Sequence, residues 1–137
     1  AADGTIAVRP GNRLPGIPRH SLALSLDRSA ALPGGRKLVL GADLSARSGT
    51  WRLGDEGNRD RQVPGHVLVN LRGQLELRRG FTLFGSVSNL FDRRYASLGT
   101  YAEIGEVDLA EVPGASDPRA DAPGAPRRWT IGITASF

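Results

Sequence analysis

Cysteine and long hydrophobic runs are both missing from this sequence of 137 residues. The absence of cysteine is compatible with an envelope protein, in which disulfides are optional, and by itself it excludes little. Hydrophobic residues make up 39% of the chain, but they never form the roughly 18 consecutive apolar residues that a membrane-spanning helix needs. A transmembrane helix is therefore excluded.

Lysine is almost absent as well. Lys37 is the only one, so nearly all the positive charge behind the net charge of +4 is arginine. Proteins that bind nucleic acids gather arginine and lysine on one face, often beside stacking aromatic residues. Here the arginines are scattered and interleaved with acids, as in residues 59–61, and this pattern disfavours a nucleic-acid partner.

The sequence does contain five segments in which apolar and polar residues alternate with a period of two. That period places one set of side chains on each face of a β-strand. Glycine (18) and proline (9) are frequent for so short a chain, as expected where turns separate strands. We predict an all-β fold, an antiparallel up-and-down meander with no charge on the apolar faces. The predicted strands are 20–28, 37–47, 66–78, 81–89 and 128–137.

The connections between these strands alternate between short and long. Residues 29–36 and 79–80 are short, whereas 48–65 and 90–127 are long and polar. Outer-membrane β-barrels have short periplasmic turns and long extracellular loops. If the last strand ends at the periplasmic side, both long connections are extracellular, and residues 1–19 are the tail of an earlier extracellular loop.

Alternation alone fits a soluble barrel as well as a membrane barrel. Three features favour lipid against the apolar face: the one-sided long loops, a polar face rich in Ser, Thr and Gly, and the terminal aromatic Phe137. Five strands cannot close a barrel, since small closed barrels need about 8. We therefore expect further strands upstream, together with any export signal, because the chain begins at Ala1 without methionine.

Three stretches resemble the C-terminal part of TonB-dependent outer-membrane receptors. Residues 11–20 are similar to that family's glycine- and proline-containing entry into a late strand, ending in Pro-Arg-His. Residues 87–95 resemble the segment in which the penultimate strand enters its last loop, and 123–127 the closing Pro-Gly-x-Pro-Arg segment. The positions that carry the last two resemblances are Asn89, Leu90, Phe91, Asp92, Tyr95, Gly124, Pro126 and Arg127.

The resemblance implies an outer-membrane barrel of about 22 strands with a plugged lumen. It implies active import of a scarce ligand, most commonly a ferric siderophore, with energy delivered by the TonB system. The plug and the TonB-contacting segment are not in this sequence, and Ala135 and Ser136 stand where an aromatic residue is often found. No cofactor is expected.

The resemblance also suggests roles for individual residues. The last strand would be recognised by the barrel-assembly machinery through strand pairing, and the pattern concerned is Trp129, Ile131, Ile133, Ala135 and Phe137. Asn89 and Asp92 are expected to hydrogen-bond the backbone where the strand ends. Trp129 and Tyr95 are candidates for the aromatic girdle at the membrane boundary.

Contacts with a ligand are expected in the loops, from residue types that hold anionic or aromatic groups. The candidates are Trp51, Arg52, Arg59, Arg61 and Tyr101. An acidic stretch at Glu103, Glu106, Asp108 and Glu111 lacks the ligand spacing of an EF-hand and is interpreted as a solvated loop.

Two alternative functions stay open, a passive porin-like channel and a barrel enzyme. The only histidines are His20 and His66, and neither lies in a nucleophile motif such as Gly-x-Ser-x-Gly, so we do not expect an enzyme.

Overall fold

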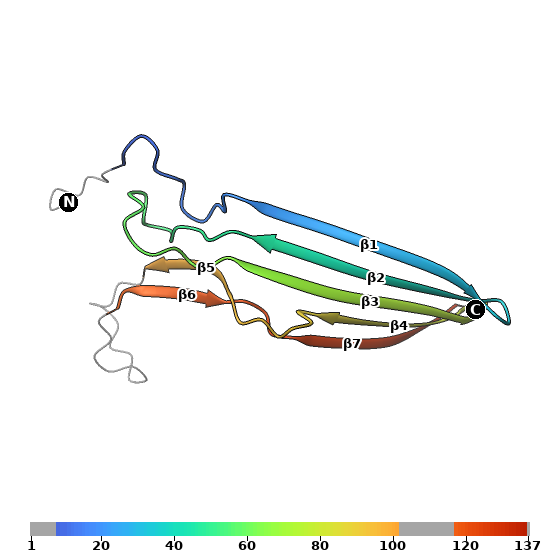
Figure 1. The fold of residues 1–137 in the computed structure, drawn as a ribbon. Coiled ribbons are helices and arrows are strands. Elements are labelled where there is room, and N and C mark those ends of the chain that lie inside the picture. Colours follow the sequence, from blue (N-terminus) through green and yellow to red (C-terminus); the bar gives the residue numbers. More distant parts are fainter. Residues whose placement is uncertain (1–7, 102–116, 137) are drawn as a thin grey trace, which may run out of the picture. The chain divides into compact units, whose positions relative to one another are not determined.

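The structure is a computed structural model that describes residues 8–101 and 117–136. Within these residues it is all-β and contains no helix, which confirms the predicted fold class (Figure 1). In the same residues, no helix is long and apolar enough to cross a membrane. The strands are β1 (Ser21–Leu32), β2 (Arg36–Arg47), β3 (His66–Arg78), β4 (Phe81–Ser88), β5 (Ala96–Tyr101), β6 (Arg119–Pro123) and β7 (Arg128–Ala135).

The chain divides into two compact units, each built from three separate stretches of sequence. The first, here called the sheet unit, comprises the described residues of 21–47, 66–94 and 125–137. The second, here called the loop unit, comprises those of 1–20, 48–65 and 95–124.

The sheet unit is one antiparallel sheet in the order β1-β2-β3-β4-β7. Each strand pairs with the next one along the chain, except that β5 and β6 intervene in sequence between β4 and β7. The antiparallel five-stranded meander is therefore as predicted. Among the described residues the sheet is open, with β1 and β7 at its edges.

The first hairpin is longer than the sequence predicts. Residues 29–36 were expected to be a loop, but the β1–β2 ladder continues to the pair Leu32 and Arg36. Gly34 and Gly35 adopt positive φ angles of 80° and 73°, a conformation that glycine tolerates best. They form the tight turn between the two strands. Arg28, which already belongs to the predicted strand 20–28, lies on the apolar face opposite Leu40, so the expectation of a charge-free apolar face was wrong.

The segment 90–127 also differs from the expected loop without strands, because β5 and β6 pair there as a two-stranded sheet. These strands have only six and five residues, too few to give a clear alternating pattern in sequence. The acidic stretch 103–111 lies outside the described residues.

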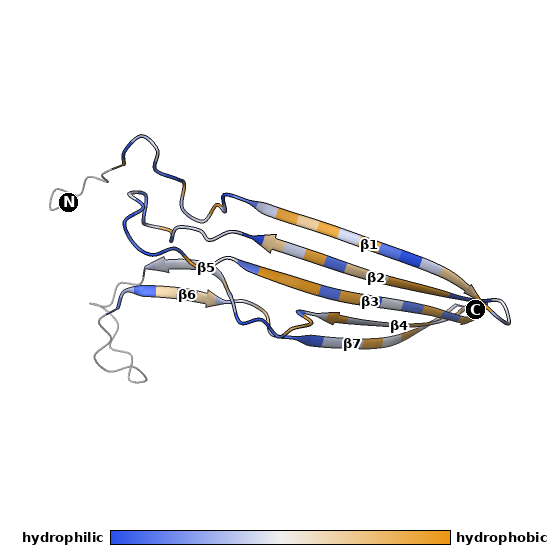
Figure 2. Cartoon of the chain, in the orientation of Figure 1, coloured by the Kyte–Doolittle hydropathy of each residue, from blue (hydrophilic) through white to orange (hydrophobic). Residues whose placement is uncertain are grey.

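The register of the five-stranded sheet brings all the apolar sets onto one face. A typical row contains Leu26, Ala42, Leu71, Val87 and Trp129. Figure 2 shows hydrophobic and hydrophilic residues alternating along the long strands. Most large side chains of this face are exposed, from 36% at Leu83 to 79% at Ile131.

The sheet therefore has no hydrophobic core of its own. Among the described residues the only buried hydrophobic side chain is Val63, and it belongs to the loop unit. The apolar face must meet something other than water to satisfy the hydrophobic effect.

Candidate functional site

The polar face of the sheet carries an arginine held between two aspartates. Arg72 of β3 lies 2.7 Å from Asp27 of β1 and also pairs with Asp43 of β2, which accepts a hydrogen bond from Ser25 at 2.6 Å. Gly41 belongs to β2, which lies between β1 and β3, and a Cβ at this position would lie 2.5 Å from both Arg72 and Asp27. The glycine makes room for a charge cluster that spans three strands.

The end of β4 is fastened by Asn89, which is 5% exposed and has a φ of 51°. Its side chain accepts a hydrogen bond from the Arg93 amide at 2.8 Å and donates to the carbonyls of Arg93 and Ala125 at 3.0 Å. The predicted backbone role of Asn89 is confirmed by these contacts.

Asp92 makes the second link across the same place. It has a φ of 50°, and its carboxylate accepts a hydrogen bond from the Arg127 amide at 3.0 Å. Asn89 and Asp92 thus join the exit from β4 to the segment that enters β7. The two motifs that carry the family resemblance in this part of the chain are in contact with each other.

The remaining residues of these motifs lie nearby in sequence but have different surroundings. Leu90 donates its amide to the carbonyl of Val69 at 2.8 Å, whereas the Phe91 side chain is 74% exposed. Tyr95 covers Gly124 so closely that a Cβ at that glycine would lie 2.1 Å from the ring. Pro126 is exposed.

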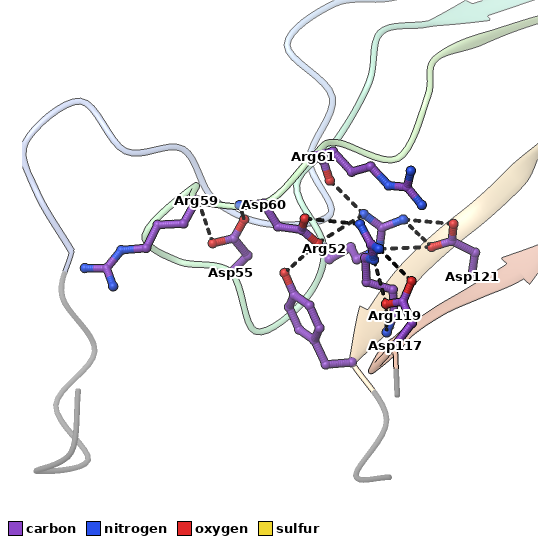
Figure 3. A network of polar contacts seen from close by, with 9 residues as sticks. Arg52, Asp55, Arg59, Asp60, Arg61, Asp117, Arg119 and Asp121 are labelled. Carbon is purple, nitrogen blue, oxygen red and sulfur yellow. Dashed lines mark hydrogen bonds and ion pairs between the residues drawn. The ribbon is translucent and has the colours of Figure 1, made fainter. Parts of the chain in front are cut away.

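The centre of the loop unit is Arg52, which is 1% exposed (Figure 3). Its guanidinium binds Asp121 of β6 through Nε at 3.1 Å and through Nη2 at 2.8 and 2.9 Å, a bidentate arrangement. Nη1 donates to the carbonyl of Arg61 at 2.7 Å. Gly99 allows this approach, because a Cβ there would lie 2.9 Å from Arg52 and 2.4 Å from Val63.

Asp60 extends the network toward β5 and β6. It lies 3.6 Å from Arg52 and 3.6 Å from Arg119, and it accepts a hydrogen bond from the Tyr101 hydroxyl at 3.1 Å. The hydrogen bond from the Arg61 backbone is the largest influence that lowers the pKa of Asp60. Burial, followed by the bond to Asp60, raises the pKa of Tyr101.

Arg119 also forms an ion pair of 2.6 Å with the exposed Asp117. The hydrogen bonds from Arg119 lower the pKa of Asp117 to about 2. Each of the two arginines of this network, Arg52 and Arg119, is therefore paired with two aspartates, and this favours a structural role for the cluster.

The five ligand-contact candidates fall into three groups. Arg52 and Tyr101 are engaged in the network, and Arg59 and Arg61 are exposed in the same loop unit. Trp51 lines a hollow together with Arg13 and Arg19, which the sequence analysis did not single out. The only signal for Arg13 and Arg19 in the sequence was their position in residues 11–20, the stretch that resembles a strand entry.

The proposed assembly pattern follows one face of β7. Trp129, Ile131 and Ile133 are 64%, 79% and 67% exposed, and Ala135 is exposed too. Phe137 lies outside the described residues. No group of three or more potential metal ligands occurs in the part of the chain that the structure describes.

Comparison with family models, with curated proteins and with solved structures gave no match. The function is therefore inferred from the two faces of the sheet, from the linked motifs and from the loop unit.

Proposed function

We propose that this chain forms part of the wall of an outer-membrane β-barrel of the TonB-dependent receptor type, which binds and imports a scarce ligand such as a ferric siderophore. The observation that carries the proposal is the apolar face, shared in register by five strands and largely exposed, with Arg28 as the charge within it. Lipid covers such a face without any further protein layer.

The dimensions of the apolar face suit an outer membrane. On β3 it runs from Val67 to Leu77, ten residue steps, or about 33 Å at roughly 3.3 Å per residue. At a strand tilt of about 40°, this length spans about 25 Å of depth, the height of the apolar band on outer-membrane barrels.

Strand tilt also accounts for Arg28, the charge within the apolar face. Strands about 4.8 Å apart, tilted by about 40°, shift a row of paired residues by about 12 Å in depth between β1 and β7. In one tilt direction Arg28 of β1 approaches the periplasmic headgroups while Trp129 of β7 approaches the outer ones. A long arginine side chain can then extend its charge to the interface.

The opposite face suits a polar lumen. In the Arg72 cluster, the arginine side chain is 39% exposed and the Asp27 side chain 54% exposed, so water reaches the cluster. A barrel requires further strands paired to β1 and β7, and these would remove the two open edges.

The assignment to the receptor class, and to siderophore import within it, is supported by the resemblance of residues 87–95 and 123–127. Hydrogen bonds from Asn89 to Ala125 and from Arg127 to Asp92 link these two segments. Because each of these two segments holds the other in place, a shared structural role explains why both occur in the same chain.

The membrane orientation is tested with single cysteines placed in these 137 residues, which contain no cysteine. The protein is expressed from its complete reading frame in a Gram-negative host, with any cysteine elsewhere in that frame replaced by serine. Leu24→Cys and Leu44→Cys lie opposite each other on the apolar face, and Ala23→Cys and Ser45→Cys on the polar face. We expect brominated lipids to quench a fluorophore only at the first two. A charged maleimide should label only the second two. A soluble barrel would also hide the apolar face from the maleimide, so the absence of lipid quenching at all four positions would indicate a soluble barrel.

The transport function is tested by uptake of radioactive iron from ferric hydroxamate, catecholate and carboxylate siderophores. We expect uptake of at least one to require both this protein and TonB. Uptake that persists without TonB would identify a passive channel and overturn the receptor assignment.

A further inference from the structure

A hollow of about 310 Å³ opens on the loop unit between residues 13–20 and residues 48–62. Its lining combines cationic, aromatic and amide side chains. The described residues that line it are Arg13, Ile17, Arg19, His20, Ser48, Gly49, Trp51 and Gln62. The volume reaches the lower end of the range of small-molecule pockets, roughly 300 to 1,000 Å³.

Three hydrogen bonds to backbone carbonyls hold the two walls of the hollow together. Asn58 donates from Nδ2 to the Arg13 carbonyl at 2.9 Å, and the Gly16 amide donates to the Trp51 carbonyl at 2.8 Å. At the far end the Ser48 amide donates to the His20 carbonyl at 2.9 Å. These contacts fix the hollow before any ligand arrives, which lowers the entropic cost of binding.

The glycines of the walls support the same geometry. Gly16 has a φ of 76°, which favours glycine, and Leu53 packs 3.1 Å from the position of its missing Cβ. A Cβ at Gly49 would lie 2.7 Å from the side-chain oxygen of Gln62. Side chains at these two positions would crowd the walls.

Within the described part of the chain, the arginines of the hollow lack the carboxylate partners that the arginines of the Arg52 network have. No carboxylate is among its described lining residues. The guanidinium groups of Arg13 and Arg19 have no hydrogen-bond or ion-pair partner within residues 8–101 and 117–136. Arginine presents a planar fork of donors that matches a carboxylate.

We propose that this hollow binds a small organic anion, with a carboxylate held by Arg13 and Arg19 and an apolar or planar body placed against Trp51 and Ile17. The Gln62 and Ser48 side chains add polar contacts at its base. An inorganic anion would leave the apolar wall unused. That the bound anion is the imported ligand, or one end of it, rests on the proposed function.

Benzoate is a suitable probe because it consists of a carboxylate and an aromatic ring, with no other functional group. The complete protein in detergent is labelled with 5-fluorotryptophan, and the resonance of Trp51 is assigned by its loss in Trp51→Phe. We expect benzoate to shift this resonance saturably, with a millimolar dissociation constant. The resonance of Trp129, on the apolar face of β7, should not move.

Matched variants and probes test each part of the site. Arg13→Ala and Arg19→Ala should each weaken benzoate binding about tenfold, whereas Arg94→Ala, which removes an exposed arginine of the sheet unit, should not change it. Inorganic phosphate, benzyl alcohol and benzylammonium should bind more weakly than benzoate. Equal binding of phosphate or benzylammonium, or normal binding by both arginine variants, would overturn the proposal.

The two proposals fail separately. Absent benzoate binding with the expected cysteine pattern would remove the anion site and leave the barrel. Benzoate binding without lipid quenching at any of the four cysteines would keep the anion site and remove the membrane function.

Discussion

The sheet unit and the loop unit solve the problem of stability in opposite ways. The sheet unit pairs 12- and 13-residue strands in long ladders and leaves its large apolar side chains outside. The loop unit has short strands and gathers buried groups inside, among them Thr50, Arg52, Asp55 and Val63. One unit depends on its surroundings, and the other depends on its own polar contacts.

This difference explains where charge is tolerated. In the loop unit a buried arginine is stable because Asp121 and a backbone carbonyl satisfy its donors. On the apolar face of the sheet, Arg28 has apolar neighbours such as Leu40, and in the proposed membrane barrel its charge must extend to an interface. Substitutions that add or remove one charge therefore separate the two units.

The largest effect is expected from Asp121→Ala. The substitution leaves the guanidinium of Arg52, which is 1% exposed, without its bidentate carboxylate and with only the longer 3.6 Å contact to Asp60, and we expect about 3 kcal/mol of destabilisation. Hydrogen exchange should accelerate in residues 48–63 and leave β1–β3 protected. The control Arg59→Ala removes an exposed arginine and should change little. Equal loss of protection in both units would show that they unfold together.

A charge placed on the apolar face should have the next largest effect. Leu44→Arg lies between Leu24 and Val69, and we expect it to destabilise the protein in lipid bilayers by about 2 kcal/mol. The adjacent Ser45→Arg points to the polar face and should cost far less. Reversible unfolding in lipid vesicles measures both, and similar losses would contradict the assignment of the faces.

Glycines within the sheet offer a smaller and more local test. At Gly132 a Cβ would lie 2.3 Å from the ring of Phe84 on the neighbouring strand, so Gly132→Ala must displace the ring. We expect a loss of about 1 kcal/mol. Gly85→Ala is the control, because its Cβ would meet its nearest neighbour at an ordinary 3.4 Å. If both variants were equally stable, the ring would not be held against the glycine.

Acid should produce the smallest effect, through Asp117. Its pKa in the folded protein is about 2, below the ordinary 3.8, because Arg119 donates hydrogen bonds to the carboxylate. The lower folded pKa means that this pairing stabilises the loop unit fully above pH 3.8 and is lost as the pH falls toward 2. The Arg119 side-chain NMR signal should follow that change. In Asp117→Asn the change should disappear, and its persistence would point to another carboxylate.

Sequence periodicity predicted the sheet well because a half-exposed strand records its two faces at every second residue. β3 spans 66–78, the same residues as the predicted segment. The sequence could not show where β1 ends, since its extension from residue 29 to Leu32 depends on the two glycines of the turn.

The loop unit was less predictable for a physical reason. Arg52 and Asp121 are 69 residues apart, and their pairing leaves no periodic trace in the sequence. The same holds for the hollow, because Arg13 and Trp51 come together only through backbone contacts between distant segments. Asn89 and Asp92 were predictable, since their side chains bond to backbone close to where the strand ends.

The link between Asn89 and Ala125 has a consequence for how such a protein can diversify. The chain leaves β4 and returns toward β7 through points joined by Asn89, Asp92 and the Tyr95–Gly124 hydrogen bond of 2.7 Å. Residues 96–123 are thus an excursion with a closed base. The closed base lets β4 and β7 keep their register when this insert changes, whereas the loop unit still requires its Asp121 as the partner of Arg52.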